Sequence, residues 1–373
     1  MDSAFSTLAG AGLRCYEASF TALDGYLGVK KAPLRFGLAE GSLVDLAKAS
    51  ETLEYPGLSY ADALLPPPKE VEDGHIGQGR LYLRCAETAA QAEAAAFAPL
   101  DLLRDPESGV FHDPRGVYTL LRTRLLEPRP APSETATFEA AGLLARHDYD
   151  LPPDYAPAPP RDFPLAAQRD LLELVLTGKT PERAFNFLFK TGFVAAYWPE
   201  IADLAGVGQA KEFHPEGDAW EHTMETFRHR KLPDLRLSLA LLLHDAGKPR
   251  AAAAEGRKFD RHAEIGRAVA ERFLARLGFP RALAADVGFL VRYHMLPAAL
   301  PRLPLGRGID AVDDPRFPLL LELYKCDELS TFRGPDGYYE ACAAYRSYLK
   351  HSGNPYRGAD GKKLARLYLG GAL

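Results

Sequence analysis

The sequence has little cysteine and no long apolar run, and each shortage argues against a class of protein. The four cysteines are Cys15, Cys85, Cys326 and Cys342, and no two of them form a CxxC pair. Neither a disulfide framework nor a thiolate zinc site is indicated, and a reducing cytoplasm is the expected location. No apolar run approaches the roughly 18–20 residues that would span a bilayer, so no membrane partner is expected.

An excess of basic charge is also missing. The formal net charge is −5, so no global basic field indicates binding to nucleic acid, although a local basic face stays open. The N-terminal stretch "MDSAFSTLAGAGLRCY" has no basic start followed by an apolar core, so no secretory signal is predicted.

The length and composition predict a soluble chain of several domains. At 373 residues the chain is too long for one ordinary core, which favours two or three domains. Hydrophobic residues make up 47% and charged residues 25%, both ordinary values for a globular protein. Proline-rich clusters predict surface loops or linkers at 64–74, 126–134 and 150–164.

Residue patterns divide the chain into a mixed part and a helical part, an α+β class overall. Before about residue 130, short apolar runs alternate with turn residues, and strands are expected within 79–87 and 108–116. From about residue 133, apolar spacing near 3.6 predicts helices. The expected helices cover 133–147, 164–178, 181–193, 218–230, 235–247, 262–278, 281–296, 317–332 and 337–353.

The helical part offers potential metal ligands, one set from each of several helices: His222, His244 with Asp245, His262, His294 and Asp327. A single histidine on a helix is usually a core or surface residue, but here the pattern recurs next to apolar faces. Asp327 lies within the apolar "LLLELYKCDEL", where a carboxylate should be paired or metal-bound. Imidazole with carboxylate suits Fe, Mn, Zn, Co or Ni better than Ca.

The adjacent His244–Asp245 pair in "LSLALLLHDAGKP" (237–249) is the strongest clue. Neighbouring residues of a helix point about 100° apart, so they reach one ion only from a helix wall beside a cavity. We expect Gly247 and Pro249 to end this helix and to let Lys248 turn toward the same opening. Lys248 is then either an anchor for a phosphate oxygen or an ordinary solvated lysine.

These residues resemble a known pattern. His222, His244–Asp245 and Asp327 are similar to the H…HD…D signature of the HD-domain metal-dependent phosphohydrolases, and His262 and His294 lie where two-metal members have further ligands. The resemblance implies one or two divalent ions (Mn, Fe, Ni, Co or Zn, with Mg also allowed). In that family the metal activates water for attack on phosphorus.

A narrower resemblance covers most of the chain. "FHPEGDAWEHTM" (213–224) followed by "LLLHDAGKP" resembles the HD region of bacterial tRNA nucleotidyltransferases, the CCA-adding enzymes, and of related poly(A) polymerases. Segments 138–154 and 180–209 resemble the neck helices of these enzymes. The implied division is a degenerate nucleotidyltransferase-like domain at 1–130, a helical neck at 131–205, an HD metal-binding domain at 206–353 and a tail at 354–373.

The first domain lacks the residues that this family uses for nucleotidyl transfer. Ser19–Phe20 fall where a Gly-Gly loop belongs, and Asp24 alone remains from the Arg-Asp that follows. Arg35 and Gly37 replace an Asp-x-Asp pair, and Ala94–Ala96 replace an Arg-Arg-Asp segment. Without two carboxylates no Mg²⁺ cage forms, and Arg35 would repel the ion. We therefore expect a catalytically inactive head that serves as scaffold, dimer surface or RNA cradle.

The resemblance implies hydrolysis of a phosphate mono- or diester of the nucleotide or RNA-end type. Asp245 and Lys248 are the expected catalytic residues, Lys248 binds phosphate, and Arg261 is a weaker phosphate candidate. His214 and Asp218 are expected to fix a helix start rather than to touch substrate.

Other functions stay open. The alternative is a non-catalytic module that binds RNA or nucleotide and keeps a structural metal; the net charge argues mildly against strong RNA affinity. An active CCA-adding enzyme is disfavoured by Arg35 and Gly37. Hydrolysis of guanosine tetraphosphate lacks the adjacent Glu-Asp pair expected after the HD helix. The oligomeric state is left open.

Overall fold

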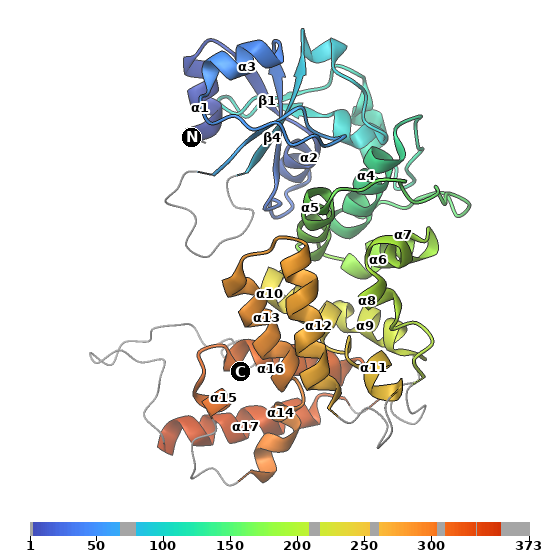
Figure 1. The fold of residues 1–373 in the computed structure, drawn as a ribbon. Helices are drawn as coiled ribbons and strands as arrows, with labels where there is room; N and C mark the ends of the chain where they lie inside the picture. Colours follow the sequence, from blue (N-terminus) through green and yellow to red (C-terminus); the bar gives the residue numbers. More distant parts are fainter. Residues whose placement is uncertain are drawn as a thin grey trace. The chain divides into compact units, whose positions relative to one another are not determined.

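The chain folds into two compact units, Met1–Tyr197 (unit 1) and Trp198–Leu373 (unit 2) (Figure 1). The computed structural model describes residues 3–67, 80–208, 217–253, 261–303, 310–332 and 334–351. Strands occur in unit 1, while the described residues of unit 2 are helical apart from turns and one isolated bridge, which confirms the α+β class. The finer division at residues 130, 205 and 353 stays a prediction. No described helix is long and apolar enough to cross a membrane.

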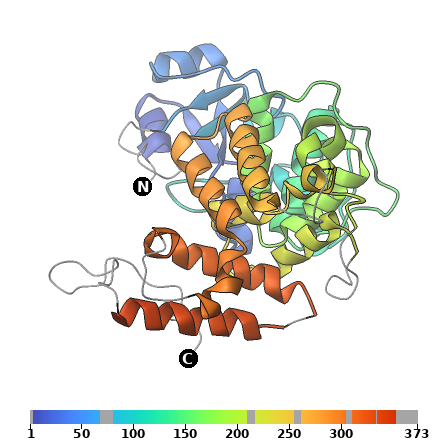
Figure 2. The same ribbon diagram turned by 60° about the horizontal axis from the view of Figure 1, so that its bottom comes forward.

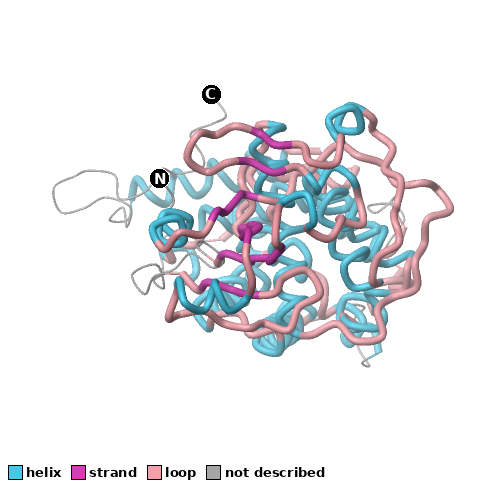
Figure 3. Tube along the Cα trace, turned by 90° about the horizontal axis from the view of Figure 1, so that it is seen from above, coloured by secondary structure: helices cyan, strands magenta, loops and turns pink. Residues whose placement is uncertain are grey.

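A six-stranded mixed sheet forms the centre of unit 1 (Figure 3). The order is β3-β4-β2-β1-β5-β6; β2 and β4 are parallel and the other pairs are antiparallel. Both strands expected from the sequence, β4 and β6, are present. The strands are β1 (Arg14–Glu17), β2 (Arg35–Glu40), β3 (Ala63–Leu65), β4 (Leu81–Ala86), β5 (Leu103–Arg104) and β6 (Phe111–His112).

The two faces of the sheet carry different cores. On one face, Cys15 and Ala39 pack with α1 (Ser3–Gly10) and α3 (Leu43–Ala49). On the other, Leu38 packs with Tyr16, its partner across the β1–β2 register. Successive residues of a strand point to opposite faces, so even-numbered residues of β2 lie on this second face.

Helix α2 (Ser19–Leu27) and helix α4 (Ser133–Arg146) are tied together by a buried ion pair in unit 1. Asp24 is fully buried and accepts hydrogen bonds from Arg146 Nη2 at 2.7 Å and from Ala32 N at 2.9 Å. His147 Nε2 lies 3.0 Å from the same carboxylate. Asp24 therefore holds the head to the first helix that follows it, a structural role. The remaining helices of unit 1 are η2 (Ala89–Gln91), η3 (Ala98–Asp101), η4 (Val117–Arg122), α5 (Leu165–Leu176), α6 (Pro181–Lys190) and α7 (Phe193–Tyr197).

Helix α10 (Leu235–Leu243) lies at the centre of unit 2. Residues 237–243 are all buried, because neighbouring helices cover α10 on several sides. It packs against α9 (Ala219–Arg228), α13 (Arg281–Tyr293) and α16 (Phe317–Leu329). Figure 2, in which α16 and α17 (Asp336–His351) are orange to red, shows these two helices side by side. The other helices are α8 (Pro199–Ala202), α11 (Lys248–Ala253), α12 (His262–Arg276), α14 (Leu296–Ala299), η5 (Leu300–Arg302) and α15 (Asp310–Asp313).

Helix starts follow the local signals. Pro181 takes the first position of α6, where its missing N–H costs nothing. Asp218 is the N-cap of α9, with its side chain accepting from Glu221 N at 3.0 Å, which confirms its expected role at the helix start. His214 lies outside the described residues.

One expectation about the His–Asp segment is wrong. Helix α10 already ends at Leu243, and Lys248 begins α11 with Pro249 in its first turn rather than after a helix end. A proline is tolerated there because the first N–H groups of a helix have no partner within it. His244–Gly247 thus form a turn between two helices.

Candidate metal centre

The metal candidates predicted from the sequence come together in unit 2. His222 lies in α9, His244 caps the C-terminus of α10 and Asp245 follows it. The other three come from three more helices: His262 opens α12, His294 caps the end of α13, and Asp327 lies in α16. Figure 1 shows α9, α10, α12, α13 and α16 gathered in this unit.

Their ligand atoms form two overlapping groups. One atom from each of His222, His244 and Asp245 lies within 4.8 Å of the others, and the same holds for Asp245, His262 and His294. Asp245 belongs to both groups, with Oδ2 3.3 Å from His244 Nε2 and Oδ1 3.8 Å from His262 Nε2. The arrangement has one shared carboxylate between two sets of imidazoles.

Asp327 extends the first group. Its Oδ1 lies 3.0 Å from His222 Nε2, and its side chain is 18% exposed. Burial opposes its ionisation, but the hydrogen bond with His222 and the other histidines hold the pKa of the Asp327 carboxyl well below its usual range. The residue is therefore a carboxylate at neutral pH.

Backbone carbonyls fix two of the rings. His244 Nδ1 donates to Leu241 O at 2.8 Å, and His294 Nδ1 donates to Val291 O at 2.7 Å. A ring that donates through Nδ1 presents a lone pair at Nε2, the atom that binds metals. Both lone pairs point into the cluster.

A side chain that the sequence analysis missed fixes a third ring. Ser330 Oγ donates to Asp327 O at 2.6 Å, so its oxygen accepts from His222 Nδ1 at 3.2 Å. Ser330 thus favours the neutral tautomer of His222 with a lone pair at Nε2, whereas the hydrogen bond from Nε2 to Asp327 forms only when the ring is also protonated there. Ser330 stands one helical turn after Asp327 on an apolar helix, a spacing that could have indicated this role.

The shared carboxylate is charged and already has one counter-charge. Burial opposes ionisation, but His244 and Lys248 together hold the pKa of the Asp245 carboxyl well below its usual range. Lys248 Nζ lies 2.6 Å from Asp245 Oδ2, and Lys248 is only 8% exposed. Burial, with His244 and His262 beside it, lowers the pKa of His294 to about 4, so this ring is neutral.

The donor set fits a divalent metal ion. His244 Nε2 is buried without a hydrogen-bond partner, and burying such an atom is costly unless something binds it. His262 Nε2 and His294 Nε2 face each other at 3.1 Å although His294 has a lone pair there. The contact is a hydrogen bond when His262 Nε2 carries the proton, and the same two atoms can hold a cation when it does not. Converging lone pairs with a carboxylate satisfy the requirements of a borderline transition metal.

Arg261 stands apart from the cluster. It is the N-cap of α12 with a left-handed backbone (φ 58°), and its side chain is 77% exposed. Its Nε donates to Glu264 Oε2 at 2.8 Å. Its assignment as a phosphate ligand stays a prediction.

Two of the head residues taken from the family alignment, Arg35 and Gly37, lie on the side of β2 that faces away from the head cavity. The Arg35 guanidinium lies over the Phe5 ring at 5.3 Å, and a Cβ at Gly37 would meet Leu83 Cδ2 at 2.9 Å. Both therefore face α1, so the expectation that Arg35 repels an ion in the head is wrong. Phe36 and Leu38 occupy the opposite face of β2, and neither carries a carboxylate.

Comparison with known proteins agrees with this geometry. A model of the HD domain matches residues 219–317, which contain five of the six metal candidates; Asp327 lies beyond the match. The CC-adding tRNA nucleotidyltransferase of Thermus thermophilus is 33% identical over 225 residues, 57% of this chain and 49% of the relative. The multifunctional CCA protein of Nitrosococcus oceani is 30% identical over 258 residues, 65% of this chain and 62% of the relative.

The chain thus spans about half to just under two thirds of the length of these two relatives. Among solved structures, the Bacillus stearothermophilus CCA-adding enzyme in complex with CTP has a TM-score of 0.52 and 15% identity, covering 94% of this chain and 81% of that enzyme. At this identity the likeness shows the fold alone.

Proposed function

Because the chain contains an HD domain and is homologous to CCA-adding tRNA nucleotidyltransferases, we propose that it hydrolyses a phosphate mono- or diester at the HD site. One observation supports the proposal most directly. Ligand atoms of four histidines lie close to the Asp245 carboxylate, and His244 Nε2 is buried without a hydrogen-bond partner. The substrate class is a phosphorylated nucleotide or an RNA end.

The two overlapping groups suggest how one or two ions would be held. His222, His244, Asp245 and Asp327 would bind the first ion; this list follows the hydrogen-bonded cluster around α9, α10 and α16. His262 and His294, with Asp245 shared, would bind a second. A divalent ion there activates water and neutralises phosphate oxygens.

The residues of the chain have their own tasks. Ser330 and the two carbonyls keep the rings in the tautomer that presents Nε2. Lys248 balances Asp245 before an ion binds; afterwards its ammonium group is available to a phosphate oxygen at the same opening. Arg261 is the second, weaker candidate for that contact.

Nucleotidyl transfer is not part of the proposed activity. The face of β2 that lines the head cavity presents Phe36 and Leu38, so this strand supplies no carboxylate pair for Mg²⁺. The solved relative binds CTP, which supports a nucleotide as substrate class without fixing where it binds. A cytoplasmic location is part of the proposal, since four free cysteines suit a reducing compartment.

The test uses the full chain. Bound metal is measured by mass spectrometry, and hydrolysis of bis-p-nitrophenyl phosphate and 2′,3′-cyclic AMP is assayed with Mn²⁺, Ni²⁺ or Co²⁺. We expect turnover with at least one ion and none for Asp245→Ala. Absence of turnover with every ion would reject the enzyme and, if metal is still bound, leave the non-catalytic RNA- or nucleotide-binding module.

A further inference from the structure

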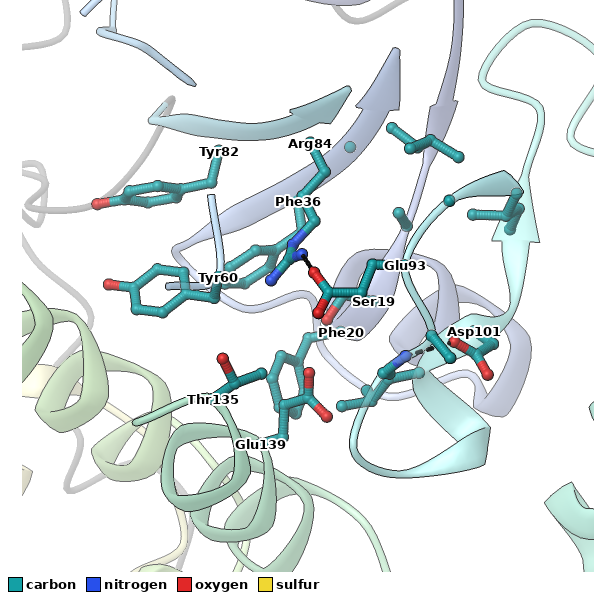
Figure 4. A pocket seen from close by; sticks show the side chains of 18 of the residues that line it. Ser19, Phe20, Phe36, Tyr60, Tyr82, Arg84, Glu93, Asp101, Thr135 and Glu139 are labelled. Carbon is teal, nitrogen blue, oxygen red and sulfur yellow. Dashed lines mark hydrogen bonds and ion pairs between the residues drawn. The ribbon is translucent and has the colours of Figure 1, made fainter. Parts of the chain in front are cut away.

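A second cavity lies in unit 1, between the sheet and helix α4, and encloses about 860 Å³ including its open mouth (Figure 4). Figure 4 shows Tyr60 and Tyr82 along one wall, Thr135 and Glu139 on the α4 side, and Asp101 on the opposite side.

The walls are mainly aromatic. Phe36 comes from β2, Phe20 from the start of α2 and Phe138 from α4, and all three line the cavity. Tyr60 stacks on Phe138 with ring centroids 4.1 Å apart, which makes this wall rigid. Across from the rings, the lining of 92–95 is alanine at three of its four positions, and such small side chains leave room for a ligand.

The cations that line the cavity are already neutralised. Arg84 forms an ion pair with Glu93 and also donates to Ser59 O. Arg115 lies 3.9 Å from Asp101 and donates to Ala92 O. Asp101 has a further partner in Arg129. Neither lining guanidinium is left over to bind an added anion.

Glu139 is the lining acid that takes part in none of these ion pairs. It is 7% exposed, and no cation lies within ion-pair distance of it among the described residues. It accepts one long hydrogen bond, 3.3 Å, from Phe97 N. Burial raises the pKa of Glu139 to about 8, although Arg84 and backbone N–H groups counteract this. The group is therefore mostly protonated at neutral pH, and once it is ionised its carboxylate has acceptor positions left for a ligand.

The lining of the cavity also contains backbone strain. Ser19, which lines the cavity at the start of α2, has φ 50°, a left-handed conformation that a residue with a Cβ rarely adopts. Such strain persists only where the surroundings impose it, and it is enriched at ligand sites.

We propose that this cavity binds a small primary amine carried on a flat apolar body, with its ammonium group donating to Glu139 and its body against Phe20, Phe36 and Phe138. The ammonium supplies the counter-charge that the chain does not. The ring faces attract a cation, and the apolar body displaces water from an aromatic wall. Such a ligand is distinct from the phosphate ester of the HD site.

A nucleoside triphosphate does not fit the same chemistry. Its phosphates would meet three carboxylates, Glu93, Asp101 and Glu139, against two guanidiniums that are already paired. No carboxylate pair extends from β2 into the cavity to hold the Mg²⁺ that accompanies a triphosphate.

The test compares 2-phenylethylamine with its neutral isostere 2-phenylethanol by calorimetry on the full chain at pH 9, where Glu139 is mostly ionised. We expect the amine to bind at least ~10-fold more tightly, the worth of one charge-assisted hydrogen bond. Glu139→Gln should abolish this preference, while Glu134→Gln on the same helix, at a residue that does not line the cavity, should keep it. Ala95→Leu, which narrows the cavity without changing charge, should weaken amine binding.

Three results would overturn the proposal: no binding of the amine, equal binding of amine and alcohol, or displacement of the amine by CTP with Mg²⁺. If Glu139→Gln fails to fold, the amine–alcohol comparison on the unaltered chain and the Ala95→Leu variant still decide it.

Discussion

The HD cluster and the head cavity both lack a cation, but they call for cations of different kinds. In the HD cluster, imidazole nitrogens and carboxylates converge and His244 Nε2 is buried without a hydrogen-bond partner, so the missing partner is a cation of high charge density. In the head cavity, both lining arginines are paired and a single carboxylate is left among aromatic rings. The missing partner there is a singly charged, partly apolar cation.

The difference shows how one chain can gather metal-ligand side chains in one unit and build an apolar cavity in the other. Histidines with their outer nitrogens bonded to the backbone are held for metal binding whether or not an ion is present. On the side of β2 that lines the head cavity, by contrast, Phe36 and Leu38 offer apolar side chains, which do not bind a metal ion. A substitution in one region can therefore be compared with the other region, which it leaves unaltered.

Removing the shared carboxylate should have the largest effect. Asp245→Ala deletes a ligand of both groups, and losing the several kcal/mol that a metal contributes to charge stabilisation lowers hydrolysis on the order of 10³-fold. Bound metal should fall with it, measured by mass spectrometry. Asp203→Asn, an exposed aspartate of unit 2, is the control and should change neither. Equal activity of the two variants would contradict the assignment of the site.

Neutralising Glu139 should change how stability depends on pH. Its pKa is about 8 in the fold against 4.5 for the ordinary group, so the fold binds this proton more tightly than the unfolded chain. Its stabilisation is complete below about pH 4.5 and is lost as pH rises through 8, a loss of up to about 5 kcal/mol. Glu139→Gln should remove this loss.

The measurement is the urea midpoint at pH 5.5, 7 and 9 for this variant, for Glu134→Gln and for the unaltered chain. The Glu139→Gln midpoint should exceed that of the unaltered chain at pH 9 but not at pH 5.5. A parallel pH profile in all three proteins would show that Glu139 titrates normally.

Removing the hydroxyl behind His222 should weaken metal binding. Ser330→Ala frees the ring to adopt the other tautomer, and loss of such a positioning contact typically costs ~10–100-fold in metal affinity. Calorimetric titration with Mn²⁺ or Zn²⁺ measures it directly, independently of turnover. Thr331→Ala, one residue further on, is the matched control because its hydroxyl donates to Glu328 O. A Ser330→Ala affinity equal to that of the control would mean that the ring is held by packing.

Removing a helix cap should have the smallest effect. Asp218→Ala takes the cap from α9, which carries His222, and should cost about 1 kcal/mol of stability with a slight loss of metal affinity. Ser42→Ala removes the capping box of α3 in unit 1 and should cost a similar amount without any change in metal affinity. Thermal unfolding and metal titration of both variants separate the two effects.

The sequence was sufficient for the helices and for the residues that gather at the HD site. The expected helices formed close to their predicted bounds because apolar spacing and caps act locally, as at Pro181 and Asp218. His222 and Asp327 are 105 residues apart yet meet at 3.0 Å, a contact suggested only by family resemblance.

The sequence could not show to which side of a strand a side chain points, or where the backbone ends one helix and starts the next. The alignment placed Arg35 and Gly37 at a catalytic face, but a strand register decides which alternate residues point there, and a shift by one reverses it. Lys248–Pro249 looked like a helix end and is a helix start, because both are compatible with proline. The aromatic wall was missed because its members come from α2, α4, β2, β4 and a loop.

The glycine after the dipeptide has a consequence for how the protein can change over evolutionary time. A Cβ at Gly247 would lie 2.0 Å from His262 O and 2.6 Å from Gly266 N, so the turn and the start of α12 touch backbone to backbone. The spacing between the two ligand groups is therefore set by main chain, which ordinary surface substitutions do not alter. Residues elsewhere around the cluster can be exchanged without altering this contact, whereas no side chain can be added at position 247 without moving the start of α12.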